Sequence, residues 1–231
     1  MNFKNNILEV IQKVFEIFNY LFTSNLNEKK YLKSKLSIYK NIIVFDVGAN
    51  LGTYSDKVNK IFSNKTILLH LFEPNKYLIK NLSSKFNGHA INEVAISDFN
   101  TESTLYINSI SSQSSLTENN SFIGEEAEKI IVNTIRLDNY IIDKQIEKIH
   151  LLKLDVEGYE LNSLKSLGKH LNKEYIEIIK VEIHFRNGDN FRTINEILNK
   201  NGFYLDGFTN TKYLNGKILF LDAYYSSERL N

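Results

Sequence analysis

The chain has 231 residues, of which 42% are hydrophobic and 24% charged, and these values are ordinary for a globular protein. Its 28 basic and 27 acidic side chains give a net charge of +1, so composition favours no polyanionic partner. There is no cysteine, which excludes disulfides, thiol nucleophiles and cysteine-bound metals. No apolar run reaches the roughly 18 residues of a membrane span.

Residues 3–23 predict an amphipathic helix, because their apolar side chains recur at helical spacing with charges between them. The apolar positions are Ile7, Ile11, Val14, Phe15, Phe18, Leu21 and Phe22. Packing on the domain is the expectation, and a homodimer contact or a membrane-surface helix are the alternatives. Charges interrupt the apolar run and no small-residue cleavage site follows, so a signal peptide is not predicted and a cytoplasmic location is expected.

The lysines at positions 29, 30, 33 and 35 are interpreted as a solvated connection. Residues 1–40 are therefore expected to form an N-terminal helical extension, and residues 41–231 a single domain. A local basic patch at Lys29–Lys35 keeps nucleic acid open as a partner, although the near-neutral chain argues against it.

From residue 41 onward the pattern alternates between strand and helix. The expected strands are 42–47, 66–72, 90–96, 150–155 and 177–183, and the expected helices are 52–62, 75–86, 159–170 and 190–201. Runs 203–209 and 217–225 predict a closing antiparallel hairpin. The polar segment 97–121 is expected to be loop-like, and within 100–130 a lid and plain disorder are both open. This order predicts an α/β fold with a mostly parallel sheet.

The run 42–52 carries the strongest local signal. A β-branched strand ends at Asp46 and leads into Gly48 and Gly52, which is typical of a tight turn before a helix facing a ligand. Gly48 permits the turn, and Gly52 is expected to let the helix pack close to the strand. Asn50 stands where a dinucleotide fingerprint has its second glycine, so a nucleoside without a pyrophosphate is favoured over NAD.

Acidic and polar residues follow the next strands. Glu73 ends the second strand, where a carboxylate can accept both ribose hydroxyls, and Pro74 suits the first turn of the next helix. Ser97 and Asp98 end the third strand, where they are expected beside an adenine or in a simple turn.

Further along, two strands end in groups that can carry chemistry. Asp155 and Glu157 follow the strand at 150–155 and are interpreted as functional, because a core strand rarely ends in two acids without a partner. Glu160 is interpreted as a helix cap. His184 ends the strand at 177–183, and among the five histidines it is the one at the expected catalytic rim.

Five blocks of sequence together resemble the FkbM-type S-adenosylmethionine-dependent methyltransferases. They are FDVGANLGTYS (45–55), LFEPNKYLIKNL (71–82), EVAISD (93–98), TIRLDNYI (134–141) and LLKLDVEGYELNSLKSL (151–167). The resemblance implies a class I methyltransferase (Rossmann-like) fold with a mostly parallel seven-stranded sheet and a C-terminal antiparallel hairpin. It also implies S-adenosylmethionine as the cofactor, S-adenosylhomocysteine as the product, and methyl transfer to a hydroxyl.

The resemblance also assigns roles to individual positions. The implied cofactor-binding residues are Asp46, Gly48, Ala49, Asn50, Ser55, Glu73, Pro74, Ser97, Asp98 and Asp155. The acceptor is expected to be a sugar or another hydroxyl-bearing small molecule, in surface polysaccharide or natural-product biosynthesis. Asp155, Glu157 and His184 are the expected catalytic residues, with Asp155 or His184 as the base and Glu157 orienting the acceptor.

Several alternatives remain beside this interpretation. Asp155, Glu157 and Glu182 could offer oxygen ligands to Mg²⁺, but their spacing does not demand a metal and none is expected. A catalytically silent cofactor-binding or scaffold protein would share the fold. An NAD-linked enzyme lacks its second glycine at Asn50, and the single proline, Pro74, excludes the Pro-Pro-Tyr motif of amino-directed DNA methyltransferases.

Overall fold

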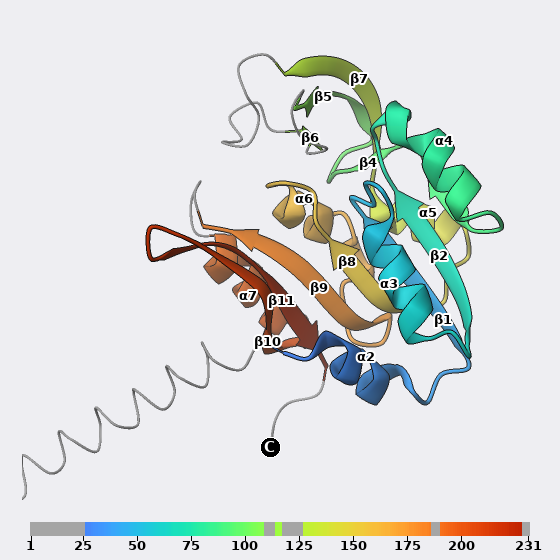
Figure 1. The fold of residues 1–231 in the computed structure, drawn as a ribbon, viewed down its shortest axis with the longest axis vertical. Helices are drawn as coiled ribbons and strands as arrows, with labels where there is room; N and C mark the ends of the chain where they lie inside the picture. Colours follow the sequence, from blue (N-terminus) through green and yellow to red (C-terminus); the bar gives the residue numbers. More distant parts are fainter. Residues whose placement is uncertain (1–25, 109–113, 117–126, 186–189, 228–231) are drawn as a thin grey trace, which may run out of the picture.

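A computed structural model describes residues 26–108, 114–116, 127–185 and 190–227. The expected helix at 3–23 lies outside these residues. Seven strands form one sheet in the order β10-β11-β9-β8-β1-β2-β3 (Figure 1). Their bounds are β1 Asn41–Val47, β2 Thr66–Phe72, β3 Ala90–Asn92, β8 Ile149–Leu154, β9 Ile176–His184, β10 Tyr204–Leu214 and β11 Lys217–Ser226.

The pairing within this sheet confirms the expected fold. The neighbours β3, β2, β1, β8 and β9 pair in parallel, whereas β11 runs antiparallel to both β9 and β10. Asn215 and Gly216, with φ of 51° and 75°, form the two-residue turn between β10 and β11. Left-handed backbone at both positions is what a tight hairpin turn requires, and Asn-Gly supplies it at low cost.

Helices cover both faces of the sheet (Figure 1). Their bounds are α2 Glu28–Leu36, α3 Thr53–Ile61, α4 Lys76–Lys85, α5 Leu137–Asp143, α6 Glu160–Lys165 and α7 Asn190–Lys200. The first three pack on one face, where Leu32, Val58 and Leu82 join a core with strand residues such as Val44. The last three pack on the opposite face, where Leu164 and other helix residues join a second core. Among the described residues, no helix is both long and apolar enough to cross a membrane.

The solvated connection expected at residues 29–35 is wrong, because these residues belong to α2. Asn27 accepts a hydrogen bond from the backbone N–H of Lys30 at 3.1 Å and so caps the helix. Leu32 and Leu36 are fully buried one turn apart. This nine-residue helix packs on the sheet mainly through two buried leucines. The apolar pattern that would predict a helix is therefore weak, and the lysines around it dominate the sequence.

A second, four-stranded sheet corrects the expectations for residues 90–121. The expected strand 90–96 splits, because β3 joins the large sheet while β4 (Ala95–Ile96) pairs with β7 (Glu128–Ile135). Residues 101–107 form the strand β5 (Thr101–Ile107), and β6 (Ser114–Ser115) pairs with it. Burial of Leu105 and Ile107 on β5 explains why this polar stretch is a strand: alternate apolar residues face a small core.

Two other boundaries also differ from the sequence-based expectation. The helix expected at 159–170 ends as α6 at Lys165, and a separate 3₁₀ turn covers Gly168–His170. Gly168 has a φ of 51°, a conformation that does not continue an α-helix. Strand β10 runs on to Leu214 through an irregular register near Asn210, whose φ is also 51°.

Candidate active site

A cavity of about 720 Å³ lies at the carboxyl ends of the parallel strands. Its walls come from the turns after β1, β2 and β8, from strands β9 and β11, and from β6 of the small sheet. In doubly wound sheets, ligands bind at this edge, where neighbouring loops diverge. Of the residues expected to carry chemistry, the cavity is lined by Gly48, Ala49, Asn50, Glu73, Pro74, Asp155 and Glu157, whereas Asp46, Ser55, Ser97, Asp98 and His184 are not part of its lining.

The turn after β1 is shaped by close backbone contact. Gly48, Asn50 and Gly52 have φ values of 76°, 49° and 70°, all in the left-handed region. A Cβ on Gly48 would lie 1.9 Å from the carbonyl oxygen of Asp155, so no other residue fits there. A Cβ on Gly52 would lie 2.2 Å from the ring of Phe86, the residue that follows α4, and 3.0 Å from Leu82 on α4. The expected close neighbour was the strand, but the observed one is the end of this helix.

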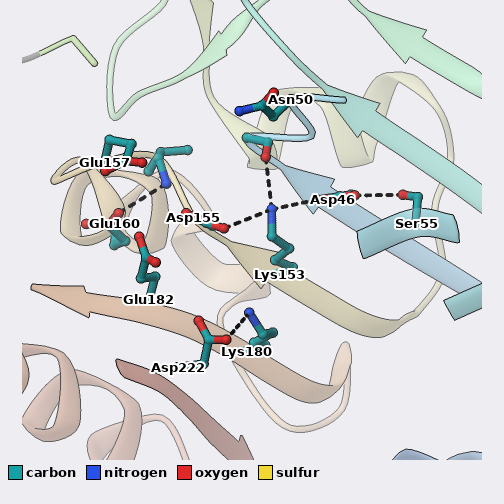
Figure 2. A network of polar contacts seen from close by, with 12 residues as sticks. Asp46, Asn50, Ser55, Lys153, Asp155, Glu157, Glu160, Lys180, Glu182 and Asp222 are labelled. Atoms are coloured by element: carbon teal, nitrogen blue, oxygen red, sulfur yellow. Dashed lines mark hydrogen bonds and ion pairs between the residues drawn. The ribbon is translucent and has the colours of Figure 1, made fainter. Parts of the chain in front are cut away.

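Asp46 and Ser55 lie beneath this turn and do not line the cavity. Asp46 is fully buried and accepts hydrogen bonds from Ser55 Oγ at 2.7 Å and Lys153 Nζ at 2.9 Å. Lys153 also donates to the Gly48 carbonyl at 2.9 Å, and its Nζ is 3.4 Å from an oxygen of Asp155 (Figure 2). Asp46 therefore supports the turn from below, through a lysine that the sequence-based reasoning missed.

Glu73 closes the cavity beside β2. Its two carboxylate oxygens accept backbone hydrogen bonds from Asn50 and Asn75, each at 2.8 Å. Burial raises the pKa of Glu73, and these two hydrogen bonds act in the opposite direction. Pro74 lines the cavity beside it. The carboxylate is thus held in one orientation, with oxygen lone pairs left to accept hydroxyl donors.

Ser97 and Asp98 lie next to the cavity without lining it. The backbone N–H of Ser97 donates to the Ile135 carbonyl at 3.0 Å, and an Asp98 oxygen accepts from Asn162 at 2.9 Å. The cavity wall at this point is apolar instead. It consists of Val94, Ala95, Ile96 and Leu105.

Three acidic residues near the carboxyl ends of β8 and β9, namely Asp155, Glu157 and Glu182, form what we call the acidic rim. Asp155, Glu157 and Glu182 line the cavity, whereas His184 stands behind them. The Nε2 atom of His184 lies 2.7 Å from Glu182 Oε2 and 3.6 Å from Glu157 Oε2. Glu157 has a left-handed backbone with φ of 51°, and its carbonyl accepts a hydrogen bond from Ser115 Oγ at 2.7 Å.

Burial and neighbouring charges shift the pKa values of the rim in opposite directions. Burial alone would raise the pKa of Asp155, but the charges of Lys153 and Lys180 outweigh it and hold that pKa below its usual range. Burial, reinforced by the charge of Asp155, raises the pKa of Glu182 to about 11. Asp155 is therefore ionised at neutral pH, whereas Glu182 holds a proton as long as no cation replaces that proton.

Glu160 has a structural role, but it is not the helix cap that was expected, because α6 begins at Glu160 itself and its N-cap residue is Tyr159. One of its oxygens accepts hydrogen bonds from the backbone N–H groups of Val156 and Gly158, each at 3.1 Å. It therefore stabilises the turn that carries Glu157.

Lys153, Lys180 and Asp222 are site residues that the sequence-based reasoning missed. Lys180 Nζ pairs with Asp222 at 2.8 Å, and both lysine Nζ atoms approach the Tyr54 ring, at 5.7 Å for Lys153 and 5.0 Å for Lys180. A signal was present: β8 reads Leu-Leu-Lys-Leu-Asp and β9 reads Ile-Ile-Lys-Val-Glu, and the two lysines pair in register. A lysine inside an apolar strand is rarely buried without a partner.

Helix α2 also contributes to the cavity, through Glu28. Its carboxylate accepts a hydrogen bond from the Tyr224 hydroxyl at 2.5 Å and forms an ion pair with Lys57. Leu26, just before the helix, donates its backbone N–H to the Phe208 carbonyl at 2.8 Å. The segment before β1 is thus attached to the edge of the sheet that β10 and β11 form.

Comparisons with known proteins find a family model and several solved structures that are similar to this chain. The family model described as "Methyltransferase FkbM domain" matches residues 46–205. The solved structure of methyltransferase FkbM from Methylobacillus flagellatus KT has a TM-score of 0.56 and 14% identity, covering 90% of this chain and 50% of that one. The chain thus spans half the length of that relative. No curated protein sequence matches.

Two further solved structures are similar at lower scores. Magnesium protoporphyrin IX methyltransferase from Synechocystis PCC 6803, with bound S-adenosylmethionine, has a TM-score of 0.46 and 13% identity, covering 97% of this chain and 84% of that one. Precorrin-6y C5,15-methyltransferase from Geobacter metallireducens GS-15 has a TM-score of 0.44 and 12% identity, covering 88% and 93%. Because the family model matches more than half of the sequence, the chain belongs to the methyltransferase FkbM domain family, whose cofactor is S-adenosylmethionine.

Proposed function

We propose that this protein transfers the methyl group of S-adenosylmethionine to a hydroxyl oxygen of a sugar or a similar small molecule. The observation that carries the proposal is the acidic rim: Asp155 and Glu157 open into the same cavity as Gly48 and Glu73. One cavity thus joins a surface suited to the cofactor with groups that can bind and deprotonate a hydroxyl.

The residues around the cofactor end fit S-adenosylmethionine. Glu73 would accept hydrogen bonds from the ribose hydroxyls, and the wall of Val94, Ala95, Ile96 and Leu105 would contact the adenine. Gly48 lets the turn lie against the backbone of Asp155, and residues 48–51 of that turn line the cavity where the methionine part would lie. When bound, the cofactor supplies an electrophilic methyl carbon. Ser97 and Asp98 remain predicted contacts for the adenine side, one residue beyond this wall.

Asp155 is the proposed base. It is ionised, lines the cavity and lies beside the glycine turn, whereas His184 does not reach the cavity wall. The Asp155 carboxylate would accept the proton that the acceptor hydroxyl loses as its oxygen takes up the methyl group, which the bound cofactor would supply with its sulfur as the leaving group. Glu157 would orient the acceptor through a second hydrogen bond, and His184 would hold Glu157 and Glu182 in place.

The acceptor is proposed to be polyhydroxylated because both hydrogen-bond donors and acceptors line the cavity. Glu28, Lys57 and Thr209 line it together with the acidic rim, and Ser114 and Ser115 face it from the small sheet. Such a surface favours a ligand with many hydroxyls, each able to donate and accept a hydrogen bond. Surface-polysaccharide or natural-product biosynthesis would use such an acceptor.

Calorimetric titration of S-adenosylhomocysteine tests the cofactor site. We expect micromolar binding that Glu73→Ala weakens at least tenfold, because the ribose loses its acceptor. Glu93→Ala is the matched control, since that acid lies outside the cavity lining. A well-folded protein that does not bind would favour a catalytically silent scaffold on the same fold.

Methyl transfer itself is tested with labelled S-adenosylmethionine and a panel of sugars and glycans. Asp155→Asn should lower turnover about 10²–10⁴-fold at saturating acceptor, with S-adenosylhomocysteine still bound. Near wild-type turnover in both Asp155→Asn and His184→Ala would contradict the proposed chemistry. Transfer to nitrogen or carbon acceptors alone would contradict the hydroxyl assignment.

A further inference from the structure

Three side chains at the acceptor end of the cavity have the arrangement of a metal-binding site. Glu182 and His184 lie two residues apart on β9 and so face the same side of the sheet. Glu157 reaches them from the turn after β8. One ligand atom from each of the three lies within 4.8 Å of the other two. We propose that Glu157, Glu182 and His184 bind a divalent cation, which deepens the proposed function by adding a group that contacts the acceptor.

The distances suit a shared ion. His184 Nε2 lies 2.7 Å from Glu182 Oε2 and 3.6 Å from Glu157 Oε2. Around a six-coordinate ion with bonds of about 2.1 Å, neighbouring ligand atoms are about 3 Å apart. The two distances that involve His184 Nε2 differ from this spacing by less than about 1 Å, and the third distance, between the two glutamates, is within 4.8 Å.

The distribution of charge gives a second, independent reason. The buried lysines are already paired: Lys153 with Asp46 and Asp155, and Lys180 with Asp222. Glu157 and Glu182 instead both face one imidazole. In Figure 2 they lie together on the side of the network away from the two lysines. Buried carboxylates require compensation, and a divalent cation provides it without adding protein charge.

The surroundings favour binding at a partly open site. The side chains of Glu157, Glu182 and His184 are 18%, 10% and 13% exposed, so the cluster is shielded from bulk water. Glu157 and Glu182 nevertheless line the cavity. An ion held by three protein ligands would keep its remaining positions toward that cavity, where an acceptor hydroxyl can coordinate and become more acidic.

The ligand set indicates the kind of ion. Two carboxylate oxygens favour Mg²⁺ or Mn²⁺, and one imidazole nitrogen is compatible with Mn²⁺ in particular. The sequence had offered Asp155, Glu157 and Glu182 as the oxygen set. The structure instead pairs Asp155 with Lys153 and brings His184 into the cluster. Asp155 is thereby left as the base beside the ion.

Mn²⁺ binding to the full chain, followed by electron paramagnetic resonance with S-adenosylhomocysteine present, tests the site. We expect one ion per chain. Glu182→Gln and His184→Gln should each weaken binding about tenfold or more, since each removes a ligand while keeping a polar side chain of similar size. Glu93→Gln is the matched control, because it removes a carboxylate charge that lies outside both the cavity lining and the triad.

The outcomes separate the cation site from the proposed function. Absence of Mn²⁺ binding, or equal weakening by Glu93→Gln, would overturn the site, the latter by showing only a general charge effect. Calorimetry with S-adenosylhomocysteine on the same samples reports whether each variant is folded and whether the cofactor site is intact. Binding of S-adenosylhomocysteine without Mn²⁺ would overturn only the cation site, and the reverse result would overturn only the methyltransferase proposal.

Discussion

The two ends of the cavity are built in different ways. The cofactor end consists mainly of backbone turns, with Gly48 and Asn50 in left-handed conformations and Glu73 held by two backbone N–H groups. The acceptor end consists of buried charged side chains from neighbouring strands, linked by ion pairs. The first design depends on local geometry, and the second on pairs formed between strands far apart in sequence. Lys153 joins the two, since it contacts both Gly48 and Asp155.

The largest expected effect is at this junction. Lys153→Met should lower the free energy of unfolding by about 3–5 kcal/mol, because it leaves the fully buried Asp46 without its cation and also removes the cation beside the partly exposed Asp155. Chemical denaturation measures the loss. Lys33→Met, on the exposed side of α2, should change stability by less than about 0.5 kcal/mol. If the two variants were equally stable, the two ends would not be joined through Lys153.

A smaller loss of stability is expected at the cofactor end, where two glycine variants distinguish the cost of backbone strain from the cost of a close contact. Gly48→Ala and Gly88→Ala both place a side chain at positive φ, 76° and 87°, which costs about 1–3 kcal/mol. A Cβ on Gly48 would also clash with the backbone of Asp155, whereas a Cβ on Gly88 has open space around it. Gly48→Ala should therefore also abolish S-adenosylhomocysteine binding in calorimetry, while Gly88→Ala should keep it. Retained binding in Gly48→Ala would show that the turn can move away from Asp155.

The smallest expected effect is a pH response of the strands under the cofactor end. Burial lowers the pKa of His70 on β2 to about 4, and also lowers the pKa of His89 just before β3. A histidine whose pKa is lowered on folding takes up its proton more readily when unfolded, so stability is full above pH 6.5 and falls toward pH 4. For His70, which is partly exposed, we expect a loss of about 1 kcal/mol between pH 7 and pH 5.

Thermal unfolding at pH 7, 6 and 5 measures this loss. His70→Gln, which removes the titrating ring, should flatten the pH dependence while keeping a polar group near the Tyr140 hydroxyl, which lies 2.8 Å from His70 Nδ1. Hydrogen exchange should show that β2 and β3 open earlier than β9 as the pH falls. An unchanged slope in His70→Gln would assign the acid response to other groups.

Much of the fold follows from periodicity. The five parallel strands and the closing hairpin lie within a few residues of the predicted ranges, because apolar runs and turn residues encode them locally. Periodicity did not predict the small sheet, because β5 is rich in polar residues and its strand conformation depends on its pairing with β7. Helix α2 was also hidden, because its buried stripe is only Leu32 and Leu36 within a lysine-rich stretch.

The candidate site also has one part that the sequence predicts and another part that only the tertiary structure reveals. The sequence alone determined the glycine turn, Glu73 at the tip of β2, and acids at the tips of β8 and β9, because each depends on residues next to one another in the chain. Only the tertiary structure decided that Asp46 supports the turn through Lys153, and that His184 meets Glu157 and Glu182. Those contacts depend on strand register and on how buried charges find partners, and both are settled when distant strands pair.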